Sequence, residues 1–123
     1  METDLLTKKV IGCAIEVHKT LGPGLLESSY ESCILYELQQ AGINARSQVL
    51  LPIKYKGISI DAGYRLDILI NDNLILELKA VDKLAPIHTA QLITYLKLSE
   101  IKTGLLINFN ETRLMNGIKR ISV

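Results

Sequence analysis

The chain has little of several residue types on which common protein classes depend. It contains no tryptophan and a single phenylalanine, so its core must be built mainly from isoleucine, leucine and valine. Its two cysteines, Cys13 and Cys33, do not form a CxxC pair and fall in helical patterns, where a cysteine usually acts as a small core residue. We therefore expect free thiols, as in a cytoplasmic protein.

The chain also lacks a long apolar run and an excess of either charge. No apolar segment approaches the roughly 20 residues that a membrane helix needs. The opening Met-Glu-Thr-Asp is acidic where a secretory signal would be basic, so we expect a cytoplasmic location without membrane association. The net charge of +1 argues against a nonspecific cationic coat on nucleic acid but leaves room for a local basic cleft.

What the chain does contain is enough apolar sequence for a single domain, with 123 residues of which 48% are hydrophobic. Apolar periodicity predicts helices over residues 4–21, 25–40 and 86–98. The strands expected are 47–55 with an edge or bulge at Pro52, 58–60 as its continuation or return, 64–70, 74–79, 103–109 and 114–123, the last with a bulge or turn at Asn116-Gly117.

The resulting order α-α-β-β-β-α-β-β indicates a mixed α/β fold, with a central sheet flanked by helices. A helix separates the strands 74–79 and 103–109, which predicts a right-handed crossover and a sheet that is parallel in part.

The most informative segment is the predicted hairpin 64–79, whose two apolar strands meet at the turn-forming Asn71-Asp72-Asn73. Its strands carry Asp67, Glu77 and Lys79 among leucines and isoleucines. Strand alternation places Glu77 and Lys79 on one face, with the neighbouring leucines on the other. Charged side chains in such apolar surroundings are costly unless they are paired or hold a metal.

Both explanations of these charges remain open. Lys79 could form a buried ion pair with Asp67 or Glu77. Alternatively, the two carboxylates could bind Mg²⁺, which prefers oxygen ligands and usually takes one or two carboxylates together with water and phosphate. Lys79 would then face the attacked phosphate or orient the attacking water.

Other polar residues are ordinary when each is taken alone. Glu27 lies in the first turn of the second predicted helix, where the helix dipole favours it, and Glu31 is interpreted as a solvent-facing residue. Gln91 and Tyr95 are four residues apart and share one face of the third predicted helix. Gln91 alone would be a surface amide, and Tyr95 a core aromatic with its hydroxyl at the rim.

Together these residues carry a resemblance. Gly24-x-x-Glu27-x-x-Tyr30 resembles the motif that names the GxxExxY protein family. The further similar segments are Val17-His18-Lys19-Thr20-Leu21-Gly22-Pro23-Gly24, Tyr64-Arg65-Leu66-Asp67, Glu77-Leu78-Lys79-Ala80, His88-x-x-Gln91-x-x-x-Tyr95-Leu96, Leu105-x-x-Asn108-Phe109 and Gly117-Ile118-Lys119-Arg120. That family is placed in the PD-(D/E)xK nuclease superfamily, so the resemblance implies a restriction-endonuclease-like core.

The resemblance also implies roles for particular residues. The superfamily's Asp and Glu-x-Lys correspond to Asp67 and to Glu77-Leu78-Lys79, although Leu66 stands where the superfamily's name has proline. Its helix acid corresponds to Glu27, and the Gln-x-x-x-Tyr element of the RecB-like branch corresponds to the pair on the third helix. The catalytic set it implies is Glu27, Asp67, Glu77, Lys79, Gln91 and Tyr95.

Within that set, the metal ligands would be Asp67, Glu77, Glu27 and the backbone carbonyl of Leu78. Mg²⁺ would be the cofactor, with Mn²⁺ as a substitute. Lys79 would position or activate the attacking water, and the pair on the third helix would fix the phosphate or Lys79.

The implied function is hydrolysis of phosphodiester bonds in nucleic acid, with DNA favoured, by a chain that could form a homodimer to cover apolar surface. A non-catalytic module that binds nucleic acid or protein on the same fold is the alternative, and a purely structural ion-pair network is the third interpretation. The sequence contains no recognisable helix-turn-helix, zinc finger or aromatic stacking platform that would supply sequence specificity.

Overall fold

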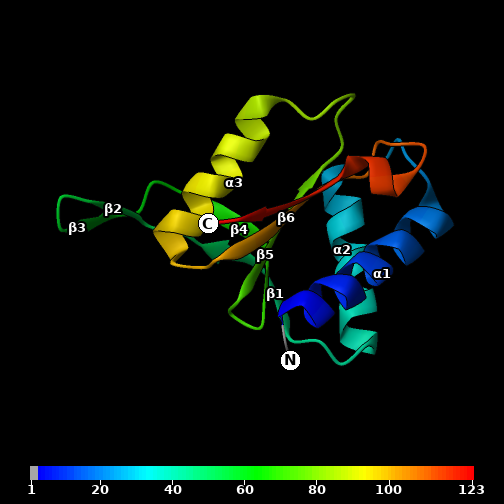
Figure 1. Ribbon diagram of the computed structural model, residues 1–123, viewed down its shortest axis with the longest axis horizontal. Helices are drawn as coiled ribbons and strands as arrows, with labels where there is room; N and C mark the ends of the chain where they lie inside the picture. The colour runs from blue at the N-terminus through cyan, green and yellow to red at the C-terminus, as the bar shows by residue number, and fades with distance from the viewer. Residues whose placement is uncertain (1–2) are drawn as a thin grey trace.

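The computed structural model describes residues 3–123, in which three α-helices pack on a five-stranded sheet (Figure 1). The elements in chain order are α1 (Thr3–Leu21), α2 (Glu27–Gln40), β1 (Ala45–Leu50), β2 (Ile53–Tyr55), β3 (Ile58–Ile60), β4 (Arg65–Ile70), β5 (Leu74–Lys79), α3 (Pro86–Ser99), β6 (Thr103–Asn108), the 3-10 helix η1 (Leu114–Gly117) and β7 (Ile118–Ser122).

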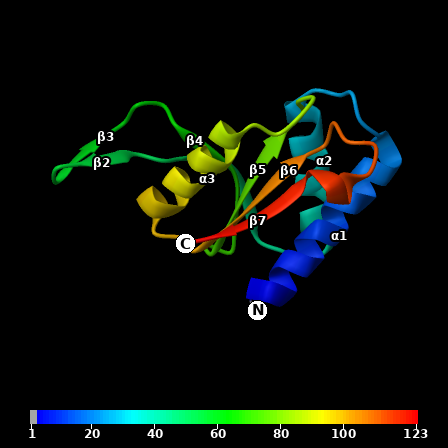
Figure 2. The ribbon, with the colours of Figure 1, turned by 45° about the horizontal axis from the view of Figure 1, so that its top comes forward.

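The main sheet has the strand order β1-β4-β5-β6-β7. Its neighbours are antiparallel except for β5 and β6, which are parallel and joined through α3. The helices α1 and α2 cover one face of the sheet, and α3 covers the other (Figures 1 and 2). The predicted element order, the hairpin 64–79 and the parallel crossover are thereby confirmed.

Each face of the sheet has its own apolar core. Beneath α1 and α2, the first helix contributes Leu6, Val10, Ala14 and Val17, spaced three or four residues apart, so they form one buried stripe. Beneath α3, a second core forms around Leu92. Among residues 3–123, no helix combines the length and the apolar character needed to cross a membrane.

The segment 47–55, predicted as one strand, is divided at Pro52. A proline has no backbone N–H to donate to a ladder, so β1 ends before it. The next strand, β2, pairs back with β3 across a turn at Lys56 and Gly57, which have φ of 49° and 82°. This β2–β3 hairpin is separate from the main sheet and projects away from the body (Figures 1 and 2).

The C-terminal segment 114–123, predicted as a strand with a bulge or turn at Asn116-Gly117, begins with the 3-10 helix η1, which contains these two residues. This turn is tight because Gly117 packs on the carbonyl of Asn108, where an added Cβ would lie only 2.5 Å from the oxygen. Only after Gly117 does the chain extend as β7 along β6.

Candidate active site

The strands β4 and β5 part at Asp67. Their ladder ends with the pair Ile68 and Leu76. Beyond that pair, side-chain carboxylates take the place of backbone carbonyls as hydrogen-bond acceptors. Leu78 donates its N–H to Oδ2 of Asp67 at 2.8 Å, and Asp67 donates its N–H to Oε1 of Glu77 at 3.3 Å. Each carboxylate therefore satisfies a backbone donor of the opposite strand, which fixes both side chains at the opening between the strands.

Glu77 is held in an environment that opposes its charge. Glu77 is only 5% exposed. Burial, followed by the negative charge of Asp67, raises the pKa of Glu77 from 4.5 to about 8. The two carboxyl groups are also close enough for a hydrogen bond between them to raise this pKa further. The buried Glu77 carboxylate beside Asp67 is therefore stabilised by binding a proton or a cation.

Lys79 does not neutralise this pair. Among residues 3–123, the ion pairs within 4.0 Å are Arg46 with Asp72 and Arg120 with Asp4. Lys79 lowers the pKa of Glu77, but its effect is the smallest of those that act on this carboxyl group. The buried ion pair considered from the sequence is therefore not formed, and the half-buried ammonium remains available for another anion.

The backbone carbonyl of Leu78 faces the same opening. On β5, the carbonyl of Lys79 accepts the N–H of Phe109 at 2.9 Å, toward β6. Since carbonyls along a strand point alternately to its two sides, the carbonyl of Leu78 points toward β4 and Asp67. It thus adds a neutral oxygen beside the two carboxylates.

Asn108 fixes the chain just after Lys79. Its fully buried side chain accepts the N–H of Val81 at 3.1 Å and donates to the carbonyl of Val81 at 2.8 Å. The adjacent Phe109 stacks on Tyr30 with ring centres 4.4 Å apart. These contacts tie the end of β5 to β6 and to α2, so Lys79 stands on a rigid strand end.

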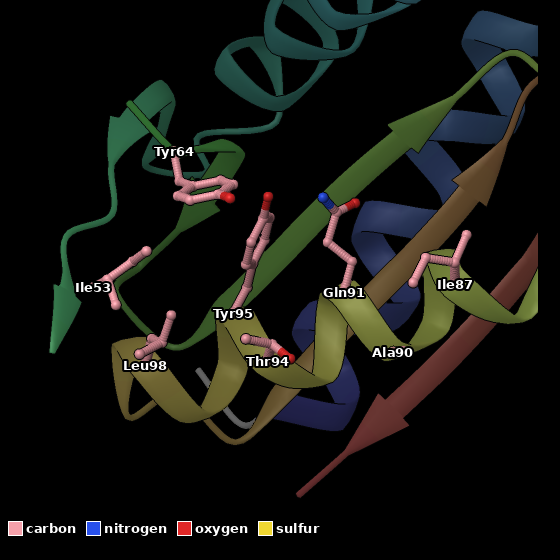
Figure 3. A pocket seen from close by; sticks show the side chains of 8 residues that line it. All are labelled: Ile53, Tyr64, Ile87, Ala90, Gln91, Thr94, Tyr95 and Leu98. Carbon is pink, nitrogen blue, oxygen red and sulfur yellow. The ribbon is translucent and has the colours of Figure 1, made fainter. Parts of the chain in front are cut away.

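Helix α3 places Gln91 and Tyr95 near the carboxylates. Figure 3 shows both side chains rising from α3 on the side of Tyr64. The pKa of the Tyr95 hydroxyl is raised, first by burial and then by the negative charge of Glu77, while Gln91 opposes the rise. The structure therefore brings these two residues to the site predicted for them.

The Gly24-x-x-Glu27-x-x-Tyr30 segment is tied together by the tyrosine. The hydroxyl of Tyr30 donates to the carbonyl of Gly22 at 2.6 Å and accepts the N–H of Leu25 at 3.1 Å. Gly24 lies in this loop with φ of 98°, a conformation that glycine adopts without strain. Tyr30 thereby anchors the loop that starts α2 and places Glu27 at its first residue.

A small pocket of about 120 Å³ lies between α2 and the opening of the strands, and we name it the acidic pocket. It is lined by Glu27, Ser28, Glu31, Gln48, Asp67 and Leu78. Glu27 therefore lies on the same side as Asp67, as expected for the helix acid. Among residues 3–123, however, no three acidic, histidine or cysteine side chains converge closely enough to hold an ion by themselves.

Two residues of the acidic pocket were missed from the sequence, Glu31 and Gln48. Glu31 is half-buried, and its pKa is raised by burial and by the charges of Asp67 and Glu27, whereas the Gln48 side chain lowers it. Nε2 of Gln48 donates to Oε1 of Glu31 at 2.8 Å. The i, i+4 spacing of Glu27 and Glu31 could have shown that the two share a helix face.

Gln48 had no comparable signal in the sequence. It lies between the ladder pairs Ser47–Ile68 and Val49–Leu66, opposite Asp67, and its φ is 52°. This left-handed conformation is costly for a residue other than glycine and occurs preferentially at functional sites.

The donor set at the opening is chemically suited to a divalent cation. It offers the buried carboxylate of Glu77, the half-buried carboxylate of Asp67 and a backbone carbonyl, which are hard oxygen ligands of the kind that Mg²⁺ binds. A family model described as the PD-(D/E)XK nuclease superfamily matches residues 4–121. No curated protein and no solved structure matches the chain.

Proposed function

Because the chain belongs to the PD-(D/E)XK nuclease superfamily, we propose that it hydrolyses phosphodiester bonds of DNA with Mg²⁺ as its cofactor. Nucleases of this superfamily generally use divalent metal ions. The observation that carries the proposal is the close carboxylate pair of buried Glu77 and half-buried Asp67, which has an unpaired lysine two residues further along β5.

The residues that would hold the ion are Asp67, Glu77 and the carbonyl of Leu78. Glu27 and Glu31 face the same opening from α2, so they would act through water molecules or complete the shell directly. The hydrogen bond from Gln48 keeps the Glu31 carboxylate turned toward the acidic pocket. An ion in this position lowers the pKa of a water molecule and stabilises the charge on a phosphate.

The remaining residues would act on the phosphate and the attacking water. Lys79 stands on the same face of β5 as Glu77, where its ammonium orients the water and offsets the negative charge that develops on the phosphate. Gln91 and Tyr95 offer an amide and a hydroxyl from α3, which hold a phosphate oxygen. Burial of Glu77 reduces the screening of its charge by water.

The test is a cleavage assay with Mg²⁺ and with Mn²⁺ on labelled single-stranded, double-stranded and branched DNA and on RNA. We expect Lys79→Ala to retain metal binding but to lose about a hundredfold or more of the cleavage rate. Asp67→Ala and Glu77→Ala should lose metal binding and cleavage together. Glu31→Gln should weaken Mn²⁺ binding by about tenfold in calorimetric titration.

Glu37→Gln is the matched control for Glu31→Gln, because Glu37 lies on the same helix but lines a different pocket with Cys33 and Tyr36. Equal metal-dependent cleavage by wild type and all three alanine variants would contradict the assignment. Oligonucleotide binding without cleavage or metal binding would favour the non-catalytic module. Sedimentation of the wild type would decide whether the chain forms a homodimer.

A further inference from the structure

Beside the proposed site lies a groove of about 410 Å³ between α3 and the base of the β2–β3 hairpin (Figure 3). We name it the apolar groove. It is lined by Ile53, Tyr64, Ile87, Ala90, Gln91, Thr94, Tyr95 and Leu98. None of these eight side chains is charged, and two of them, Gln91 and Tyr95, also belong to the proposed catalytic set.

We propose that the apolar groove binds an unpaired nucleobase next to the scissile phosphate, so that the substrate is a single strand or an unpaired strand end. This inference rests on the nuclease function proposed above. It names the structural class of the substrate, which that function leaves open.

The continuity of the groove with the site supports this occupant. A phosphate held by Gln91 and Tyr95 would place the attached nucleoside within reach of the remaining groove wall. Tyr95 lines the groove, and the pKa of its hydroxyl is raised first by burial and then by the negative charge of Glu77. Gln91 and Tyr95 lie in the middle of the groove wall, between Ile87 and Leu98, so polar and apolar contacts lie side by side, as a phosphate and its base require (Figure 3).

Tyr64 provides a surface for stacking. Its ring meets that of Tyr95 edge-to-face, with centres 6.2 Å apart and an angle of 60° between the planes. Because Tyr95 contacts it in this way, ring surface of Tyr64 stays free, and 43% of the residue is exposed. Nucleobases stack on such aromatic faces with little preference among sequences.

Cations next to the lining residues fit a polyanionic strand. Lys54 follows Ile53, Arg65 follows Tyr64, and Lys97 precedes Leu98, and all three cations are exposed. These three exposed cations each lie one residue from the groove lining along the chain, so positive charge is present in its neighbourhood although the net charge of the chain is only +1.

The shape of the groove selects against intact duplex. In a duplex each base is stacked on both faces and paired at its edge, so no base can enter an apolar groove without being extruded. A single strand or a frayed end offers its bases at far lower cost. Single-stranded binding by stacking and backbone charge is a known mode, whereas the duplex would leave the groove empty.

The test is fluorescence anisotropy with labelled single-stranded DNA, single-stranded RNA and duplex DNA, in the Lys79→Ala background so that the strand stays uncut. We expect Tyr64→Leu to weaken single-strand binding by about tenfold, and Tyr64→Phe to retain it. Ala90→Phe, which fills the groove from α3, should weaken it similarly. Duplex binding should remain unchanged in all three.

Tyr36→Leu is the matched control, because Tyr36 is an exposed tyrosine on α2 that lines a different pocket. An abasic residue moved along the strand should lower affinity at one position only. The inference is overturned if Tyr64→Leu and Ala90→Phe leave single-strand binding unchanged, if they weaken duplex binding equally, or if the abasic scan is flat. Melting curves verify that each variant is folded.

The possible results distinguish a failure of the base-binding site from a failure of the proposed nuclease function. If duplex cleavage requires Lys79 but is unchanged in Tyr64→Leu, the nuclease function is supported and the base-binding site is wrong. Tyr64-dependent binding of single strands without any cleavage would uphold the base site and overturn the nuclease. If Tyr64→Leu instead dissociates a dimer in sedimentation and leaves oligonucleotide binding unchanged, a second copy covers the groove and the inference is wrong.

Discussion

The two antiparallel hairpins of this chain, β4–β5 and β2–β3, have opposite distributions of polar and apolar residues. The β4–β5 hairpin lies in the middle of the main sheet and carries the half-buried Asp67 and the buried Glu77. The β2–β3 hairpin projects from the body and exposes Tyr55, Ile58 and Ile60 (Figure 2). Each thus contradicts the rule that charge is outside and apolar surface is inside. The carboxylates of the first hairpin form the proposed site, and the second hairpin begins at Ile53, which lines the apolar groove.

The largest expected difference between the two hairpins concerns the free energy of unfolding. Ile68 in β4 is fully buried, whereas Ile58 in β3 is 58% exposed. We expect Ile68→Ala to lower the free energy of unfolding by ~2–5 kcal/mol, because it leaves a cavity in the core. The same change at Ile58 should alter it by about 0.5 kcal/mol or less. Urea denaturation of both variants measures the difference, and similar losses would show that the projecting hairpin is packed in solution.

The next effect, which is smaller per pH unit, should appear in the pH dependence of stability. The pKa of Glu77 is about 8 in the folded chain against an ordinary 4.5, so the folded state binds more protons than the unfolded state between these values. The metal-free protein should therefore lose stability as the pH rises from 4.5 to 8, by at most about 1.4 kcal/mol per pH unit. Glu77→Gln should remove this slope.

Denaturation with a chelator present, over that pH range, gives both slopes. Glu16→Gln is the control, since Glu16 is an exposed carboxylate on α1. A wild-type slope that matches the Glu77→Gln slope would mean that the buried carboxyl group titrates normally, and the contrast between the two hairpins would weaken.

The smallest effect belongs to the exposed end of the β4–β5 hairpin. Arg46 pairs with Asp72 in its turn at 2.7 Å, but their side chains are 58% and 76% exposed. Because solvent screens such a pair, Arg46→Ala should cost under about 1 kcal/mol, and less at high salt. Arg113→Ala, at another exposed arginine, is the control in the same denaturation series. A cost of several kcal/mol would mean that the turn is coupled to the carboxylate pair.

Much of this arrangement could be predicted because its signals are local. The turn residues of the hairpin 64–79, the alternation of its strands and the i, i+4 pair on α3 are all short-range patterns. Asp67, Glu77 and Lys79 were noticed because charge among leucines is physically expensive. The sequence could not decide between an ion pair and a metal site, since that depends on where the Lys79 ammonium points.

The missing parts depend on contacts between distant segments. Gln48 reaches the acidic pocket only because β1 pairs with β4 and is distorted opposite Asp67. No residue pattern predicts that a glutamine adopts the left-handed backbone conformation. The aromatic surface was missed because Tyr64 and Tyr95 come from different elements, 31 positions apart, and meet only across the groove. Pro52 indicated an edge or bulge, but not that the chain would leave the sheet.

The distortion at Gln48 has a consequence for the sheet as a whole. β1 is an edge strand, and a regular edge offers a row of free backbone groups on which a foreign strand can add and start aggregation. With φ of 52° in the middle of β1, Gln48 interrupts that row, and Pro52 follows soon after the strand ends. The residue that faces the acidic pocket thereby also limits the growth of the sheet beyond its own chain.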